Sequence, residues 1–429
     1  MFPKKHWFQR GPDLSHTFRA LRHRNFRLFY CGQSISLIGT WMQMVAVSWL
    51  VYRLTNSPFL LGCVGFAAQF PSFILSPLGG VLADRYHRHH LLILTQSLAM
   101  LQAFVLAFLV LTHNVNVWYV LALSLFSGIV NSFDLPVRQS FTIEMLEEKQ
   151  DLANAIALNS SMVNGSKLIG PAVAGILIAS FGEGVCFLLN ALSYLAVIAA
   201  LLSMRISPRT NRPARTEIMR ELKEGFRYAY DFLPIRSLLM LTMAVSVMTG
   251  AFQTLIPVFV ARVFHGGPQL FGFLVTCSGV GAFIAAFYLA GRKSVLGLSR
   301  LIMLASGSIG VGMLIFSQVN VLWVAALAAF IVGLGMIIQI GGSNIVLQTL
   351  VDEEKRGRIM SMYGMAFIGM TPFGSLLAGY LAGRIGVTPT LFLGGTGCLV
   401  ASLLFWLNFP RYRARIRPVY VQKGILPEA

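Results

Sequence analysis

The fold of this chain is decided by a short polar stretch, Gly79-Gly80-Val81-Leu82-Ala83-Asp84-Arg85-Tyr86-His87-Arg88-His89-His90. Long apolar runs precede and follow it, so we expect a tight connection between two helices. The glycine pair lets helices approach closely, and an acid and several bases follow at once. The runs around this stretch should therefore be long helices packed side by side.

The composition places those helices in a membrane. Of the 429 residues, 56% are hydrophobic, and the mean hydropathy is +0.70. A soluble domain cannot hide that much apolar surface, so we expect an all-α polytopic membrane protein. The net charge of +18 lies mostly in short segments between apolar runs, which argues against nucleic acid as a partner.

A bilayer span needs about 20 apolar residues, and this length criterion predicts twelve transmembrane helices in the chain. The expected ranges are 26–50, 58–82, 91–112, 117–137, 153–180, 184–204, 236–260, 269–290, 300–318, 321–345, 358–383 and 388–409.

The distribution of Lys and Arg predicts the orientation. Arg53, Arg262 and Arg384 fall in one set of connections and Lys167 inside a span, whereas the other thirty of the 34 bases fall on the opposite side. We therefore expect both termini in the cytoplasm.

The spans divide into two sets of six. Residues 205–235 separate them and carry either an amphipathic helix at 217–231 or a solvated linker. Short matches recur at a nearly constant offset, such as Ala174-Gly175 with Ala378-Gly379. The predicted organisation is a cytoplasmic segment, a six-helix bundle, a cytoplasmic linker, a second bundle and a cytoplasmic tail, at 1–25, 26–204, 205–235, 236–409 and 410–429.

The opening stretch resembles the motif G-x-x-x-D-R-x-G-R-R of the major facilitator superfamily. Gly80, Asp84, Arg85 and Arg88 match, whereas His87 replaces a glycine, which puts the geometry of the turn in question. Residues 18–27, 133–141 and 159–175 are similar to the bacterial efflux branch that contains the enterobactin exporter. The resemblance covers nearly the whole chain and implies two pseudo-symmetric six-helix bundles in a bacterial inner membrane.

The resemblance also implies a function. We expect a monomeric secondary active exporter that works by alternating access and is driven by the proton motive force. Its substrate would be a siderophore, drug or metabolite. The alternatives are a nutrient importer, a lysophospholipid flippase or another lipid-handling protein, and a receptor that transports nothing.

Within the family, the acid of this stretch, a following base and an acid of the fourth span form a charge relay that holds the halves together. The resemblance implies Asp84, Arg88 and Asp134 here, with Arg138 one turn beyond Asp134. The relay would stabilise the outward-open state. The alternative is a charge cluster that only sets topology.

Span five contains Gly170, Pro171 and Gly175. Proline removes a helical hydrogen bond, and the family has a similar pattern as an antiporter motif, so we expect a functional bend. Ordinary packing of small residues is the alternative. Thr371-Pro372 is a partial counterpart in span eleven.

Lys167 lies near the middle of span five, on one stripe with Asn164. A lysine at that depth is costly and normally has a partner or faces a water-filled cavity. It either contacts an anionic group on the substrate, which would then be anionic or amphipathic, or is a structural base satisfied by carbonyls and Asn164.

Polar side chains follow spans one, four, seven and ten, which line the central cavity in this superfamily. Each could face that cavity or hydrogen-bond locally. The amides and the hydroxyl that we place in the cavity are Gln33, Thr40, Gln43, Asn131, Gln253, Gln339 and Asn344.

No motif predicts an enzyme, a cofactor or a metal site. The five cysteines lie in apolar runs without paired spacing, and His87, His89 and His90 fit a solvated connection. No acid lies deep in a span, so proton coupling comes from the family, with Asp134 as the best titratable candidate.

Replacing Asp84 tests the charge relay. Asp84→Asn removes one charge, so transport in membrane vesicles should fall while the amount of protein in the membrane fraction stays normal. Unimpaired transport by this variant would leave only the topological role.

Overall fold

The computed structural model describes residues 18–205, 227–292 and 294–427, and this part of the chain contains helices and no strand. Most of the expected amphipathic helix at 217–231 lies outside the described residues, although 227–231 is helical.

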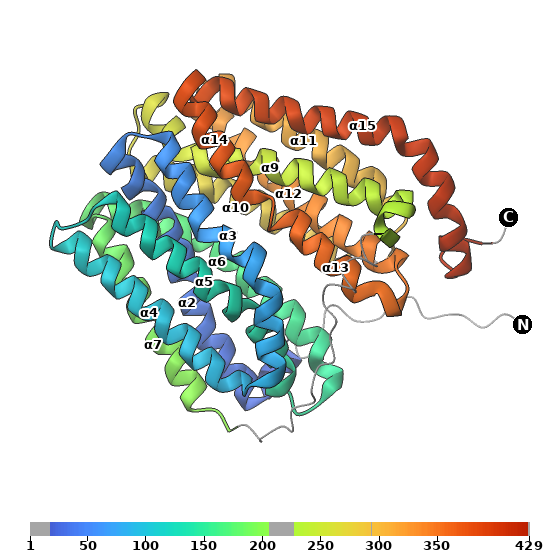
Figure 1. The fold of residues 1–429 in the computed structure, drawn as a ribbon, viewed down its shortest axis with the longest axis horizontal. Helices are drawn as coiled ribbons and strands as arrows, with labels where there is room; N and C mark the ends of the chain where they lie inside the picture. The colour runs from blue at the N-terminus through green and yellow to red at the C-terminus, as the bar shows by residue number, and fades with distance from the viewer. Residues whose placement is uncertain (1–17, 206–226, 293, 428–429) are drawn as a thin grey trace, which may run out of the picture.

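The helices follow one another in the chain with short connections (Figure 1). The longer ones are α2 (Arg24–Thr55), α3 (Pro58–Arg85), α4 (Arg88–Leu111), α5 (Val117–Phe141), α6 (Leu152–Phe181), α7 (Glu183–Leu202), α9 (Leu233–Arg262), α10 (Pro268–Ala290), α11 (Leu298–Gln318), α12 (Leu322–Leu350), α13 (Glu353–Phe367), α14 (Thr371–Ile385) and α15 (Val387–Gln422). Three short 3₁₀-helices are η1 (Arg19–Arg22), η2 (Thr142–Met145) and η3 (Lys149–Asp151).

These helices confirm the expected fold class. Within the described residues, twelve helical segments are long and apolar enough to cross a membrane. Two spans differ from expectation. Span eleven is divided into α13 and α14, because Pro372 has no amide hydrogen and cannot continue the backbone hydrogen bonds of a single helix. Helix α15 continues past residue 409 to Gln422, so the first part of the expected tail is helical.

Successive helices alternate in direction and so define two ends. The basic end carries the α3–α4 and α5–α6 connections, and the opposite end carries the α2–α3 and α14–α15 connections. At the basic end, α3 ends at Arg85 and α4 begins at Arg88. His87 has φ −64° and ψ 110°, a backbone conformation that any residue adopts. The replacement of glycine by His87 therefore leaves this turn unstrained.

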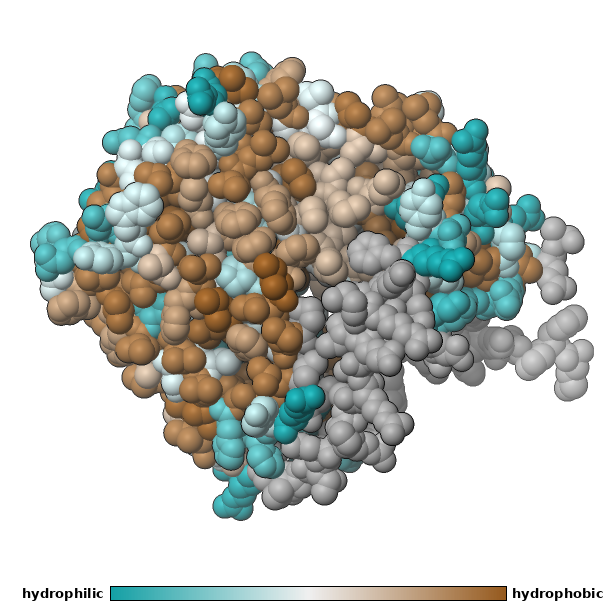
Figure 2. Space-filling view, viewed as in Figure 1, coloured by the Kyte–Doolittle hydropathy of each residue, from teal (hydrophilic) through white to brown (hydrophobic). Residues whose placement is uncertain are grey.

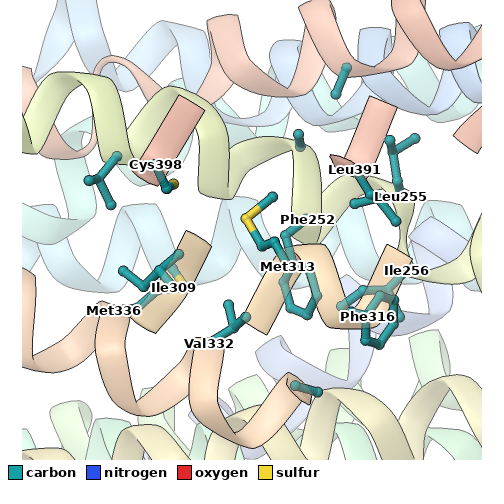
Figure 3. Packing of buried hydrophobic residues seen from close by; sticks show 14 of the residues in the cluster. Phe252, Leu255, Ile256, Ile309, Met313, Phe316, Val332, Met336, Leu391 and Cys398 are labelled. Carbon is teal, nitrogen blue, oxygen red and sulfur yellow. The ribbon is translucent and has the colours of Figure 1, made fainter. Parts of the chain in front are cut away.

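The helices form two bundles, one from α2–α7 and one from α9–α15 (Figure 1). Helix α9 is the central element of the second bundle, since 67% of its span is buried, more than for any other described span. Its Phe252 packs edge-on to Phe316 of α11 at 5.1 Å between ring centroids, beside Met313 and Leu391 (Figure 3). This part of the core around α9 is built from large apolar side chains, whereas Thr242, Ser246 and Thr249 are buried elsewhere along the helix.

Large apolar side chains cover much of the outside. Phe287 and Trp323 are 78% and 73% exposed, and apolar residues spread over the visible face (Figure 2). Continuous apolar surface of this kind is what lipid tails would cover.

Helix η1 is fastened to the α5–α6 connection. Asp151 is buried and binds His23 Nε2 at 2.8 Å and the guanidinium of Arg19. These hydrogen bonds, that of His23 foremost, hold the pKa of Asp151 below its ordinary value. The beginning of the described chain is thus tied to its own bundle.

Two pairs of glycines join the bundles at the opposite end. In the first, Gly62 of α3 crosses Gly379 of α14. A Cβ on Gly62 would lie 2.6 Å from Ser375 O and 3.1 Å from Gly379 Cα. Only glycine allows this approach, which brings backbone against backbone.

The second crossing repeats the first. Gly175 of α6 meets Gly272 of α10, and a Cβ on Gly272 would lie 2.6 Å from Pro171 O and 2.9 Å from Gly175 Cα. The segments Pro58-x-x-x-Gly62 and Pro268-x-x-x-Gly272 occupy equivalent places in the two halves. The two crossings hold the bundles together at this end.

A methyl group at either crossing should therefore disfavour closure of the opposite end. Gly62→Ala or Gly272→Ala introduces overpacking of about 1–3 kcal/mol, which corresponds to a roughly tenfold smaller closed population. Spin labels at Asn114 and Asn320, one in each bundle at this end, should report longer distances in both variants.

Gly65→Ala is the matched control for this change. A Cβ there meets its nearest neighbour, Ser375 Cβ, at 3.4 Å, so its distances should equal those of the parent protein. Unchanged distances in Gly62→Ala and Gly272→Ala would contradict the role given to the crossings.

Candidate functional site

The region between the bundles is closed at the opposite end by polar contacts as well as by glycines. Arg262 of α9 donates from Nε to Tyr52 Oη at 3.0 Å and from a terminal nitrogen to Asn56 O at 3.0 Å. Trp49 of α2 stacks on Phe271 of α10 with centroids 6.1 Å apart. These contacts seal the end at which α2 and α9 finish.

Four phenylalanine rings extend the seal toward the middle. Phe66, Phe70 and Phe73 of α3 surround Phe373 of α14, with centroid distances of 5.7–6.0 Å. A Cβ on Gly369, in the break between α13 and α14, would lie within 3 Å of the Phe73 ring.

Beyond that break the second bundle turns away from α3. Helix α14 packs against α3, whereas α13 packs against α9 and α12 of its own bundle. The two bundles therefore meet along the opposite half of their length and diverge toward the basic end (Figure 1).

Lys167 lies where three helices from both bundles come together. Its ammonium is 5.4 Å from the centroid of the Trp41 ring on α2, a cation–π contact. Its carbonyl is the atom nearest to Gly279 of α10, where a Cβ would be 3.3 Å away. Asn164 donates to Ser160 O at 2.8 Å, so the structure shows this amide bonded to its own helix.

Within the described residues, no carboxylate lies within ion-pair distance of the Lys167 ammonium. A cation with only an aromatic neighbour can accept an anion from outside the protein. This lysine and Trp41 are the best candidate for a substrate contact.

Asp134 is buried within the first bundle and has several partners. It accepts from Thr95 Oγ1 at 2.8 Å and from Gln96 Nε2 at 2.7 Å, both on α4. Arg138, one turn along α5, lies 3.5 Å away. The expected neighbour on the helix face is therefore present.

Arg88, the base expected beside Asp134, binds a different carboxylate. Its guanidinium donates to Glu144 at 2.8 Å and to Ser140 O at 3.4 Å. The side chain of Asp84 and residue Gly80 lie outside the described residues, whereas Arg85 is exposed at the end of α3. Arg88, Asp134 and Arg138 thus lie toward the same end of the first bundle, with Glu144 as a partner of Arg88 that the sequence reasoning missed, and the charge relay remains a proposal.

The predicted bend residues lie at two contacts. Helix α6 is continuous through Pro171. A Cβ on Gly170 would lie 2.6 Å from Trp41 Cβ, so this glycine fits α6 against α2. Gly175 forms the crossing with α10. The pattern therefore places α6 between its own bundle and the other one, and the bend remains a proposal.

Gln43 links three helices of the first bundle. Its amide donates to Gln102 Oε1 at 2.9 Å and accepts from Asn190 Nδ2 at 2.7 Å. Thr40 donates to Ser36 O at 2.9 Å, and Gln33 is buried. Gln43 and Thr40 thus serve contacts within the first bundle in this structure.

The remaining predicted cavity residues divide into two kinds. Gln339 is fully buried and donates to Thr242 Oγ1 at 3.1 Å, and Asn344 accepts from Gln348 at 2.6 Å. Asn131 and Gln253 are exposed. The exposed pair, like the partly exposed Lys167, can meet another molecule without rearrangement.

Arg262, Tyr52, Gly62 and Gly272 were missed from the sequence, whereas Gly175 was predicted as a bend residue and Gly379 was noted only as part of a repeat. Arg262 appeared only as a base in a connection. The repeat of Pro-x-x-x-Gly at Pro58 and Pro268 was a usable signal for the crossings, since it marks the same position in both halves.

Comparison with known proteins places these features in a family. Over 385 residues the chain is 24% identical to the staphyloferrin A transporter of Staphylococcus aureus, covering 89% of this chain and 95% of that one. Over 390 residues it is 25% identical to the enterobactin exporter of Shigella boydii, covering 90% and 92%.

The fold is similar to that of a solved nucleoside transporter. The TM-score is 0.72 at 11% identity, covering 90% of this chain and 99% of the other. A family model described as a transmembrane secretion effector matches residues 15–417. The chain therefore belongs to this transporter family of the major facilitator superfamily.

Proposed function

We propose that this transporter exports a small anionic or amphipathic molecule from the cytoplasm. The observation that carries the proposal is Lys167, which lies at the junction of α2, α6 and α10 with Trp41 as its aromatic neighbour. An ammonium and an indole together favour a substrate with a negative group and an apolar body.

Two observations support export as the direction of transport. The excess of Lys and Arg at the basic end favours a cytoplasmic location for that end and for both termini. With that orientation the bundles meet on the outer side and diverge toward the cytoplasm, the arrangement in which an exporter takes up its substrate. The relatives' names also describe export and efflux, of enterobactin and of macrolides.

We also propose that the two six-helix halves predicted from the sequence are the parts that move during transport. Residues 26–204 and 236–409 are the moving units, joined by the linker at 205–235, and both units lie in the bacterial inner membrane. Protons are the proposed coupling ion. Asp134, a buried carboxyl that accepts hydrogen bonds from Thr95 and Gln96, is the candidate proton carrier.

Transport in inside-out vesicles tests direction and coupling. Carboxyfluorescein as an organic anion should accumulate inside the vesicles when a pH gradient, acidic inside, is imposed, and a protonophore should abolish the accumulation. Vesicles without the protein are the control. Movement of the anion only outward would favour the importer, and transfer of a labelled lysophospholipid alone would favour the flippase.

Replacing Lys167 tests the substrate contact separately. Lys167→Ala should reduce carboxyfluorescein transport about tenfold or more, in line with the loss of a partly buried charge contact. Transport of ethidium, an organic cation, should change much less.

Lys167→Arg is the matched control, because it keeps the charge beside Trp41 and should retain most anion transport. Equal loss of anion and cation transport in Lys167→Ala would assign this lysine a structural role.

A further inference from the structure

A second basic site lies away from the central region, at the basic end of the second bundle. A cavity of about 400 Å³ opens between the start of α9 and the last turns of α15. Its described lining consists of Asp231, Phe232, Leu233, Arg236, Arg411, Ala414 and Arg415. The transport mechanism above uses none of these residues.

The charge of this lining is strongly positive. Three arginines and one aspartate give it a net charge of +2. Arg411 and Arg415 are four residues apart on α15 and therefore project from one face of the helix. The beginning of α9 adds the partial positive charge of a helix N-terminus.

The arginines differ in how they are held. Arg236 donates to Tyr230 O at 3.3 Å and lies 5.0 Å from the centroid of the Tyr230 ring. Arg411 and Arg415 are exposed, and neither has a hydrogen bond or ion pair with another described residue. Two guanidinium groups are thus available next to one that is fixed.

The cavity lies at the depth of lipid headgroups. On α15 the exposed apolar side chains Leu403, Trp406 and Leu407, 50–60% exposed, end one turn before Arg411. On α9 the exposed Met240 follows one turn after Arg236. Figure 2 shows hydrophilic residues gathered over the end of α15, next to a broad apolar surface. An aromatic and apolar belt followed by arginines marks the membrane interface.

We infer that this cavity binds a phosphate group, and that the phosphate belongs to an anionic phospholipid. Guanidinium groups match phosphate oxygens in geometry and charge, and basic pockets between transmembrane helices bind anionic headgroups. Phe232, Leu233 and Ala414 offer the glycerol and upper acyl carbons an apolar wall. A free phosphate would leave that wall unused.

Asp231 should weaken the binding of an anion in this cavity. Its carboxylate lies in the same lining and repels an anion, so neutralising it should strengthen binding.

Lipid binding to the purified full-length protein in detergent tests the inference, with native mass spectrometry as the readout. The probes are phosphatidylglycerol, phosphatidylcholine and glycerol 3-phosphate. The parent protein should retain phosphatidylglycerol, whereas phosphatidylcholine, whose phosphate is neutralised by its own cation, and glycerol 3-phosphate should bind weakly. The double variant Arg411→Gln with Arg415→Gln should bind phosphatidylglycerol roughly tenfold or more weakly.

The same helix supplies the control. Arg413→Gln with Arg417→Gln removes the same charge from another face of α15 and should leave binding unchanged. Asp231→Asn should bind phosphatidylglycerol more tightly, which keeps the test valid if the double variant folds poorly. Equal losses in the two double variants, weaker binding by Asp231→Asn, or equally tight binding of glycerol 3-phosphate would each overturn the assignment.

Discussion

The arrangement of the two bundles depends on four glycines that let backbones touch. At Gly62 with Gly379, and at Gly175 with Gly272, the helices approach so closely that a single Cβ would meet a carbonyl or a Cα within about 3 Å. Lipid tails are as apolar as the helix surfaces, so hydrophobic burial supplies no driving force for this contact. Packing between small residues does. Such a contact forms only in one register, and it separates without leaving a buried charge behind.

Packing at the closed end determines where Lys167 lies near the middle of the molecule. Because α6 is held against α10 at Gly175, the same helix brings Lys167 to the junction with α2, about two turns away. Gly170 sets the depth of α6 on α2 and thereby the distance between Lys167 and Trp41. The position of Lys167 is thus a consequence of backbone packing on both sides of its helix.

Much of the fold could be predicted from the sequence, because spans and topology follow from apolar length and from the placement of bases. The partners of individual side chains could not. Gln43 looked like a cavity residue because it lies on a polar stripe, yet its stripe faces α4 and α7 of its own bundle. Helical spacing shows which residues share a face and does not show which neighbour that face meets. In the same way, the resemblance suggested Asp134 as the partner of Arg88. The structure instead places Glu144, in η2 directly after α5, with its carboxylate 2.8 Å from the guanidinium of Arg88.

The two ends carry different chemistry, which bears on how the molecule can alternate. At the opposite end, Arg262 binds a phenol and a backbone carbonyl, both neutral, so opening exposes a guanidinium to water without stranding a carboxylate. At the basic end, the ion pair between Arg88 and Glu144 lies within one bundle. Opening the opposite end requires that packed surfaces and the two hydrogen bonds from Arg262 to neutral acceptors separate. Water can replace a neutral acceptor, whereas a partly buried ion pair that loses one partner leaves an uncompensated charge. The basic end is therefore the one at which a change of charge, through a proton or a substrate, can decide which conformation the transporter adopts.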